Sequence, residues 1–440
     1  MAGGVIIAAP ASGSGKTVLT LGLIRHLATA GVAVASAKVG PDYIDPAFHA
    51  AASGRPCINL DPWGMRPETL AAAAATLLDH AEIVVCEGVM GLFDGATASQ
   101  GSTADLAVGL GWPVVLVVDV RAQAASAAAV VAGFARHRPG VRVAAVVFNR
   151  VGSDRHADVV REACRLTVPE VAVLGCLPRT PGLDLPERHL GLVQAREHPD
   201  LGSFLDRAAR LVADHVDVSA LMALGADPLS PSAGGGQPAA RPIRPLGQRI
   251  AVADDIAFAF RYPLVIDGWR AAGAEISPFS PLADQPPDAA ADAVYLPGGY
   301  PELHAGRLAA NRTFLEGVRQ AAARGATVFG ECGGYMVLGR GLVDGEGHRH
   351  AMLDLLDLET SFADRHLHLG YRRAVLPAET VLGPVGTGYR GHEFHYARTL
   401  REGPGQPLFH CSGAAGQDLG PTGLVQGSVL GSFVHLIDED

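Results

Sequence analysis

The sequence predicts an α/β protein with two parallel β-sheets, one in an N-terminal domain and one in a C-terminal domain. Short apolar runs alternate with longer alanine- and leucine-rich segments, a pattern typical of buried parallel strands joined by crossover helices. At residues 226–248, proline, glycine and serine replace this pattern, and the apolar runs resume afterwards. We therefore expect a first domain at 1–225, a linker at 226–248 and a second domain at 249–440.

Each domain contains several predicted strands. In the first domain they are VIIAAP, VAVASAK, EIVVCEG, PVVLVVD, VRVAAVVFN and VAVLGCLP. Between them, residues 17–31 and 69–81 have the composition of helices. In the second domain the strand pattern restarts with RIAVADD, AEISPFSP, AVYLPGG and ATVFGEC, and from about residue 370 the sequence is rich in predicted strands.

Composition narrows the class of protein. With 440 residues and 48% hydrophobic content, the chain is long enough for two or three domains with cores of their own. The formal charge of −10 argues against a general affinity for nucleic acid or an anionic membrane, and no apolar run reaches the length of a membrane span. Six cysteines form no CxxC pair, which favours a reducing cytoplasm. The apolar N-terminus lacks a basic leader and predicts a buried strand, not a signal peptide.

The segment APASGSGKT, residues 9–17, predicts a nucleotide-phosphate loop. In such a loop backbone N–H groups converge on phosphate oxygens, the lysine reaches the β- and γ-phosphates, and the hydroxyl binds magnesium. Pro10 replaces the first glycine of the usual pattern, but the loop follows a strand and opens a helix, as the mechanism requires. A switch ATPase of the MinD or ParA type would have a lysine where this chain has Ala11. The expected ATP-binding residues are Ser12, Gly13, Ser14, Gly15, Lys16 and Thr17.

Charged residues follow the second and third predicted strands, at the edge of the sheet where α/β proteins bind ligands. KVGPDYIDPAFH (38–49) is either part of the site, with Lys38 facing an anion and its aspartates holding magnesium or substrate, or a solvated turn. EGVMGLFDG (87–95) places a carboxylate of the Walker B type at the end of a buried strand, followed by an aspartate that contacts substrate or forms a turn. Substrate candidates are Lys38, Asp42, Tyr43, Asp45 and Asp94, and metal candidates are Thr17, Asp42 and Glu87.

The segment GECGGY, residues 330–335, predicts a thiol nucleophile on a sharp strand-to-helix turn. Small residues on both sides of Cys332 allow the backbone to bend and a substrate to approach, and none of the other five cysteines has this setting. The alternative is a small buried apolar residue. A chain with this thiol and a phosphate loop is predicted to activate a substrate with ATP and to amidate it with ammonia from glutamine.

Five motifs together resemble the cobyrinic or hydrogenobyrinic acid a,c-diamide synthase family of cobalamin biosynthesis. They are APASGSGKT, KVGPDYIDPAFH, EGVMGLFDG, FNRVGS (148–153) and LPERHLGL (185–192). The resemblance implies an N-terminal half similar to dethiobiotin synthetase and a C-terminal half similar to class I glutamine amidotransferases. It further implies amidation of two acetate carboxylates through an acyl phosphate, with ATP and Mg²⁺ as cofactors and with L-glutamine and a tetrapyrrole polycarboxylate as partners.

The resemblance also implies roles for particular residues. Asn149, at the end of the fifth predicted strand, is expected to contact the adenine ring. A polycarboxylate substrate requires cations, so Arg179, Arg188 and His189 are expected either to contact it or to form surface salt bridges. LPGGYPE is similar to the oxyanion loop of these glutaminases, which implies that Gly298 and Gly299 supply a backbone amide.

The histidine that activates the thiol has three candidates. In the related cobyric acid synthase type of glutaminase the base lies on the last strand in a G-[ST]-x-x-H setting, which GSFVH matches at His435. His392 and His395 of GHEFHY are then expected to line the pocket or a domain interface, since a metal site there lacks a cysteine or carboxylate cluster nearby in sequence. Ordinary class I glutaminases have a glutamate two residues after the base, where this chain has Ile437. The third member of the triad therefore remains open.

Three functions compete at this point. The favoured one is a,c-diamidation of hydrogenobyrinic or cobyrinic acid, and the second is amidation of a related tetrapyrrole, such as nickel sirohydrochlorin or later corrin carboxylates. The third is an ATP-gated switch protein with an inactive glutaminase, which the presence of Cys332 and His435 opposes. Ammonia must pass between the domains without protonation in bulk solvent, and a homodimer would help to shield its path.

Overall fold

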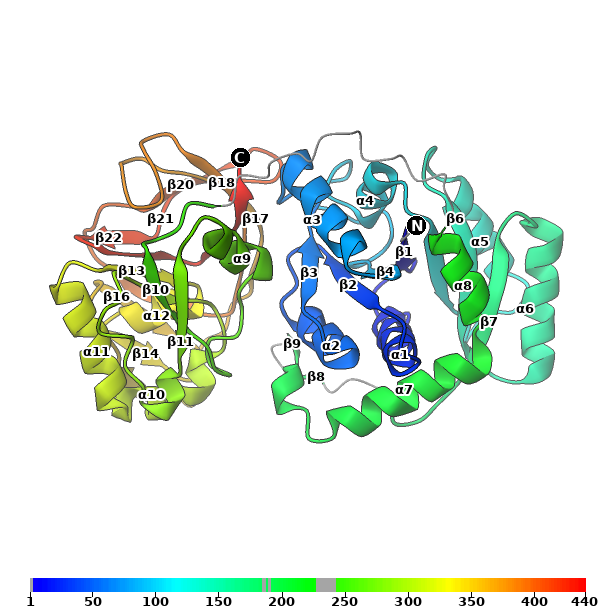
Figure 1. Cartoon of the computed structure of the whole chain (residues 1–440), viewed down its shortest axis with the longest axis horizontal. Coiled ribbons are helices and arrows are strands. Elements are labelled where there is room, and N and C mark those ends of the chain that lie inside the picture. Colours follow the sequence, from blue (N-terminus) through cyan, green and yellow to red (C-terminus); the bar gives the residue numbers. More distant parts are fainter. Residues whose placement is uncertain (1–2, 184–186, 189–190, 227–242) are drawn as a thin grey trace. The chain divides into compact units, whose positions relative to one another are not determined.

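The computed structural model describes residues 3–183, 187–188, 191–226 and 243–440, with only the backbone of 187, 188, 191 and 192. These residues form two compact units, one with residues 3–63 and 67–226 and the other with 64–66 and 243–440. Each unit has a parallel β-sheet flanked by helices (Figure 1), so the predicted α/β class is confirmed. No helix among these residues is long and apolar enough to cross a membrane.

The first unit is built on a seven-stranded, all-parallel sheet. All six predicted strands are present. The seventh, the four-residue segment CINL, was not predicted, because so short a run shows no periodicity. In sheet order the strands are β3 (Cys57–Leu60), β2 (Val34–Val39), β4 (Ile83–Glu87), β1 (Gly3–Ala8), β5 (Val114–Asp119), β6 (Val143–Val151) and β7 (Ala172–Pro178).

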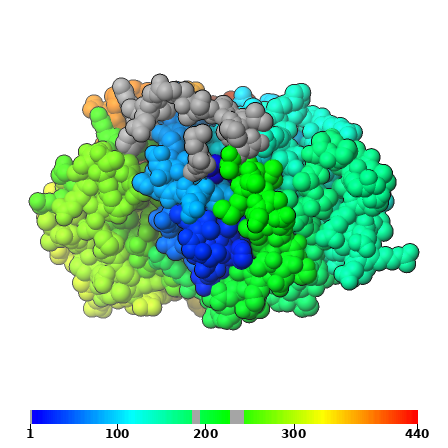
Figure 2. Space-filling model, turned by 45° about the vertical axis from the view of Figure 1, so that its right-hand side comes forward, coloured from blue at the N-terminus to red at the C-terminus, as the bar shows by residue number. Residues whose placement is uncertain are grey.

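Helices cover both faces of this sheet. One face packs against α1, α2, α7 and α8 through a continuous apolar core. Figure 2 shows α1 in dark blue beside α7 in green, although these two helices are far apart in the sequence. The helices are α1 (Lys16–Thr29), α2 (Ile44–Ser53), α3 (Pro67–Asp79), α4 (Thr103–Leu110), α5 (Ala127–Arg136), α6 (Asp154–Thr167), α7 (Leu201–His215) and α8 (Val218–Gly225). Two-residue strands β8 (Glu187–Arg188) and β9 (Gly191–Leu192) precede the short helix η1 (Ala195–Glu197).

The second unit contains a six-stranded sheet in which only the edge strand β22 is antiparallel. The four predicted strands at its start are all present. Its strands, in order, are β11 (Glu275–Phe279), β10 (Arg249–Ala253), β12 (Ala293–Leu296), β13 (Thr327–Glu331), β23 (Val429–Ser432) and β22 (Leu424–Gln426). Its helices are α9 (Pro263–Ala271), α10 (Ala305–Ala310), α11 (Arg312–Ala323) and α12 (Gly333–Leu338), with the short turns η2 (Pro281–Ala283) and η3 (Pro301–His304).

Successive side chains of β10 point to opposite faces of this sheet and belong to two different cores. Ala251 and Ala253 belong to a core formed with α11 and α12, whereas Ile250 and Val252 belong to a core formed with α9 and a second sheet. That second sheet is antiparallel, in the order β21 (Asp418–Thr422), β20 (Phe409–Gly413), β17 (His368–Val375), β18 (Gly388–His395) and β24 (Val434–Glu439). A four-stranded sheet completes the unit, with β15 (Arg349–Ala351), β14 (Gly341–Val343), β16 (Leu358–Ser361) and β19 (Arg398–Glu402).

The predicted linker differs in part from the structure. Residues 227–242 lie outside the described residues. Ile243 and Leu246, by contrast, are buried in the core of the second unit, so packing begins before the first strand. Proline-rich composition hid this packing, because two isolated apolar residues form no periodic pattern.

Candidate active sites

The phosphate loop connects β1 to α1, as its sequence predicts. α1 begins at Lys16, and Gly15 at its N-cap has φ 95°, which favours glycine. A Cβ on Gly15 would lie 2.1 Å from Asn149 Nδ2, so a larger residue would displace either the loop or the Asn149 side chain. The first N–H groups of α1 lack intrahelical acceptors and form an anion-binding end.

A cavity of about 420 Å³ lies over this loop. It brings together residues that the sequence predicted on three separate motifs, namely Lys16, Thr17, Lys38, Asp42, Asp45 and Glu87. The Lys16 ammonium donates to the carbonyl of Met90 at 2.6 Å, and burial lowers its pKa. The cavity volume falls within the range of small-ligand sites.

Glu87 contacts three polar side chains at this cavity. Its Oε1 accepts a hydrogen bond from Thr17 Oγ1 at 2.7 Å and lies 3.2 Å from Lys38 Nζ, and its Oε2 lies 2.7 Å from His49 Nε2. Burial alone would raise the pKa of Glu87, but Lys38, His49 and Thr17 lower it to about 2. Glu87 is therefore an oriented anion at neutral pH, beside the hydroxyl with which it was predicted to hold magnesium.

His49 was not predicted, although it lies within KVGPDYIDPAFH. It is fully buried between Glu87 and Cys57, whose Sγ is 3.4 Å from His49 Nδ1. Burial opposes its protonation, yet Cys57 and Glu87 raise the pKa of His49 to about 10. The protonated imidazole therefore orients Glu87 from behind, a role that sequence spacing could not reveal.

The loop after β2 is held by its own polar side chains. Lys38 Nζ lies 2.6 Å from Asp45 Oδ2, and the carboxylates of Asp45 and Glu87 raise the pKa of Lys38 despite its burial. Asp42 Oδ1 accepts from the N–H groups that open α2, at 2.7 and 3.2 Å, while Tyr43 occupies the N-cap position. Asn59 on β3 donates to the Asp42 carbonyl at 2.7 Å. β3, which the sequence did not predict, thus supports the loop that carries several predicted site residues.

Asn149 lies beneath the phosphate loop. Its Nδ2 donates to the carbonyl of Ser14 at 2.9 Å, and its Oδ1 accepts from the backbone N–H of Arg150 at the same distance. Arg150, which has φ 60° and lines the cavity, donates to the carbonyl of Gly13 at 2.8 Å. The protein itself thus uses both polar atoms of the Asn149 amide, and contact with adenine stays a prediction.

Two other substrate candidates, Asp94 and Arg179, are not among the residues that line this cavity. Asp94 Oδ2 accepts from an N–H of its own loop at 2.8 Å, the turn role left open by the sequence. Arg179 is exposed and donates to a backbone carbonyl of the β5–α5 loop at 2.9 Å. His189 and the side chain of Arg188 lie outside the described residues. Substrate contacts by these four residues stay predictions.

In the second unit, Cys332 lies on the predicted turn, between the end of β13 and the start of α12. Its φ of 48° and ψ of −104° are unusual for a residue with a side chain, a form of strain found at functional turns. Its N–H donates to the carbonyl of Ser432 at 2.8 Å. Its buried thiol donates to the carbonyl of Phe394 on β18 at 3.6 Å. The nucleophile candidate is therefore fixed by neighbours on two other strands.

Gly298 and His435 are both close to Cys332. A Cβ on Gly298 would lie 2.2 Å from His435 Cε1, 3.0 Å from His435 Nε2 and 3.3 Å from Cys332 Cβ. The carbonyl of Gly298 accepts from Phe260 N–H at 2.9 Å, which fixes the loop. The adjacent Gly299 N lies 3.0 Å from the corresponding Cβ position of Gly333. The predicted oxyanion loop therefore reaches both the thiol and the histidine.

Two histidines stand side by side here. His392 on β18 pairs directly with His435 on β24. Burial is the main cause that lowers the pKa of His435 to about 3 and of His392 to about 4, so both are neutral at neutral pH. Burial, together with the carboxyl of Glu302, raises the pKa of the Cys332 thiol. The resting pair is thus a thiol and a neutral imidazole, which can accept its proton.

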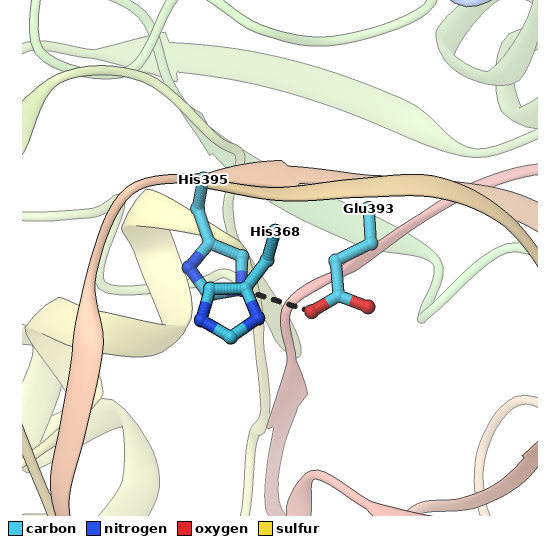
Figure 3. Close-up of side chains that lie close together, drawn as sticks. All are labelled: His368, Glu393 and His395. Atoms are coloured by element: carbon cyan, nitrogen blue, oxygen red, sulfur yellow. Dashed lines mark hydrogen bonds and ion pairs between the residues drawn. The ribbon is translucent and has the colours of Figure 1, made fainter. Parts of the chain in front are cut away.

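His368, Glu393 and His395 form a separate cluster on β17 and β18 (Figure 3). Their ligand atoms lie within 4.8 Å of one another, but the two imidazoles stack with planes 10° apart. Lone pairs in parallel planes do not converge on one ion. Glu393 also pairs with Arg372 at 2.7 Å and His395 at 2.9 Å, and His395 stacks on Phe433. This geometry fits the wall of a pocket better than a metal site.

Two buried carboxyl groups near Cys332 were not predicted. Glu331 precedes the cysteine in GECGGY, and its oxygens accept from Tyr295 Oη at 2.5 Å and Leu436 N–H at 3.0 Å. Glu302 ends the LPGGYPE motif, and no described group donates a hydrogen bond to its Oε2. Burial raises the pKa of Glu302 to about 8 and of Glu331 to about 7. The sequence offered one signal for these two residues: one directly precedes Cys332 in GECGGY and the other ends LPGGYPE.

Comparison with known proteins now decides the family. Residues 5–193 match the CobQ/CobB/MinD/ParA nucleotide binding domain, and residues 249–440 match the CobB/CobQ-like glutamine amidotransferase domain. Proteins named hydrogenobyrinate a,c-diamide synthase are similar along nearly their whole length. That of Rhizobium meliloti (strain 1021) is 54% identical over 99% of both chains, and that of Sinorhizobium sp is 55% identical over 99% of this chain and 98% of its own. This chain belongs to the hydrogenobyrinate a,c-diamide synthase family. Family membership confirms the resemblance predicted from the five motifs.

The close approach at Gly298 leads to a first prediction. Gly298→Ala places a methyl group within the radius of the His435 ring, which must move away from Cys332. We expect glutamine hydrolysis to fall by at least about 100-fold, the usual minimum for loss of an acid/base group. The N-terminal unit is unaltered, so the reaction with added ammonium salts should persist. Equal loss of both reactions would contradict this interpretation.

The raised pKa of Cys332 leads to a second prediction. A thiol ordinarily titrates near pH 8.5, and burial displaces this titration upward, so thiolate is scarce at neutral pH. The rate of alkylation by iodoacetamide, without glutamine, should rise about tenfold per pH unit from about pH 7 to 9. Mass spectrometry of the Cys332 peptide measures this rate. A plateau below about pH 8 would show that the pKa is lowered instead.

Proposed function

We propose that this chain is an ATP-dependent, glutamine-hydrolysing ligase that amidates the a- and c-acetate carboxylates of hydrogenobyrinic acid in cobalamin biosynthesis. The proposal rests on one observation above all: a phosphate-loop cavity and a buried Cys–His pair occur in one chain. Its full-length relatives carry the name hydrogenobyrinate a,c-diamide synthase. The two sites supply the two halves of such a reaction, carboxylate activation and release of ammonia.

The N-terminal cavity activates the carboxylate. A carboxylate oxygen of the substrate attacks the γ-phosphorus of ATP, ADP departs, and an acyl phosphate remains. Lys16 and the N–H groups of the loop stabilise the charge on the phosphoryl oxygens, the main requirement of phosphoryl transfer. The oxygens of Thr17, Asp42 and Glu87 suit Mg²⁺, which would neutralise phosphate charge when bound. Lys38 is the cation that we assign to the substrate side.

The C-terminal site releases ammonia. His435 takes the thiol proton, Cys332 Sγ attacks the carboxamide carbon of glutamine, and ammonia leaves with the proton as a thioester forms. Backbone amides at Gly298, Gly299 and Gly333 stabilise the oxyanion. Water then hydrolyses the thioester to glutamate. Ammonia displaces phosphate from the acyl phosphate to form the amide, and two such cycles give the diamide.

The proposal also specifies the substrate as the cobalt-free acid. The relatives' names support hydrogenobyrinic acid, whereas cobyrinic acid or another tetrapyrrole polycarboxylate would need the same chemistry. Parallel assays with the cobalt-free and cobalt-containing acids, ATP, Mg²⁺ and glutamine separate these substrates.

Six free cysteines support a reducing cytoplasm as the location of this chain. A homodimer stays a prediction.

A pair of variants tests the division of labour. Cys332→Ala should abolish amidation with glutamine but retain it with ammonium salts, because carboxylate activation does not use the thiol. Lys16→Ala should abolish amidation from both nitrogen sources, since activation precedes attack in each. Product mass and ATP consumption are the measurements. The proposal fails if Cys332→Ala retains glutamine-dependent amidation, or if Lys16→Ala retains the ammonia-dependent reaction.

The assignment of the base has its own test, with His392 as a matched control on the adjacent strand. His435→Asn should slow labelling of Cys332 by a diazoketone analogue of glutamine by about 100- to 10,000-fold. His392→Asn should slow it much less. Ammonia-dependent amidation should be similar in both variants, which checks that each is folded. The reverse order of labelling rates would assign the base to His392.

A further inference from the structure

The glutaminase site contains a carboxylate that faces the proposed base. Glu331 Oε2 lies 3.9 Å from His435 Nδ1, and both side chains are buried. We propose that Glu331 is the positioning residue of this glutaminase, which orients His435 and stabilises the positive charge that it acquires from the thiol. This inference rests on the proposed function, because it assigns the group that acts through the base. Ile437, two residues after the base, is apolar and buried and supplies no such charge.

The two nitrogens of His435 face different groups. Nε2 is directed to the side where Gly298 and Cys332 approach, since the Cβ position of Gly298 lies 3.0 Å from Nε2 and 3.3 Å from Cys332 Cβ. Nδ1 is the atom nearest the carboxylate of Glu331. Cys332 near the Nε2 side of the ring and a carboxylate nearest Nδ1 follow the order of a Cys–His–acid triad, although neither nitrogen makes a hydrogen bond to these two residues in this structure.

The carboxylate itself is held in place. Tyr295 Oη, on β12, donates to Oε2 at 2.5 Å, and the N–H of Leu436 donates to Oε1 at 3.0 Å. Because Leu436 follows His435 directly, the second bond also ties the carboxylate to the backbone of the base. Glu331 in turn precedes Cys332, so one short segment carries both the nucleophile and the group that orients its base.

Another carboxylate of this region, Glu393, also raises the pKa of His435, but its oxygens are bound by other side chains. Glu393 pairs with Arg372 and His395, at 2.7 and 2.9 Å. Glu302 lies close enough to raise the pKa of Cys332, yet its Oε2 accepts no hydrogen bond from the described residues. Glu302 therefore provides a control, as a buried carboxyl group near the thiol.

The test asks whether replacing each carboxyl group slows the labelling of Cys332. Glu331→Gln preserves size and the bond from Leu436 but removes the charge that favours protonated His435. We expect labelling of Cys332 by the diazoketone analogue to slow by about 10- to 100-fold, with ammonia-dependent amidation unchanged. Glu302→Gln replaces a carboxyl group whose raised pKa keeps it mostly protonated at neutral pH, so it should leave labelling unchanged. A Glu331→Gln variant that labels as fast as the unaltered protein, or faster, would overturn the proposal.

Two further variants keep the test decisive if Glu331→Gln folds poorly. Tyr295→Phe retains the buried ring but loses one bond to Oε2, so it should slow labelling by about threefold to tenfold. In a cycle with His435→Asn, a residue that acts only through the base adds no further loss, whereas an independent role would multiply the losses. Multiplicative losses, or no effect of Tyr295→Phe, would contradict the proposal. If the unaltered protein neither hydrolyses glutamine nor reacts at Cys332, the proposed function itself fails.

Discussion

Both sites depend on one steric constraint, the approach of backbone to side chains at the carboxyl ends of parallel strands. Gly15 lies against Asn149, and Gly298 lies against His435, each at a distance that excludes a Cβ. Without these approaches the phosphate loop would lose its support and the thiol would lose its base. The same edge of an α/β sheet exposes helix N-termini and strand ends, which explains why the polar chemistry collects there.

Both sites also bury ionisable groups, but the protonation states of these groups differ between the two sites. In the N-terminal cavity, Glu87 is balanced by Lys38 and protonated His49, so its pKa lies far below the ordinary range. At the C-terminal site, burial instead keeps Cys332 protonated and His435 neutral. The first arrangement is ready for a cation and phosphate. In the second, the proton stays on the thiol and the imidazole stays neutral.

Local signals in the sequence were sufficient for most of the fold. Each long apolar run became a strand of one of the two sheets, since a buried parallel strand must be apolar on both faces. The four-residue β3 was missed because its length carries no period, and Ile243 and Leu246 were assigned to a linker because their neighbours are proline and glycine. In both cases the deciding contacts come from residues distant in sequence.

The sequence by itself determined the phosphate loop, the placement of Cys332 on a sharp turn and the family, because each depends on residues close together in the chain. Only the tertiary structure decided which side chains surround them. His49 reaches Glu87, and Asn149 supports the loop, through pairings between different strands and helices. Glu331 faces His435 across 3.9 Å although about a hundred residues separate them, since parallel strands and a return strand bring the two together. Ordinary class I glutaminases carry this carboxylate two residues after the base. In this chain the carboxylate that faces the base belongs to the residue directly before the nucleophile.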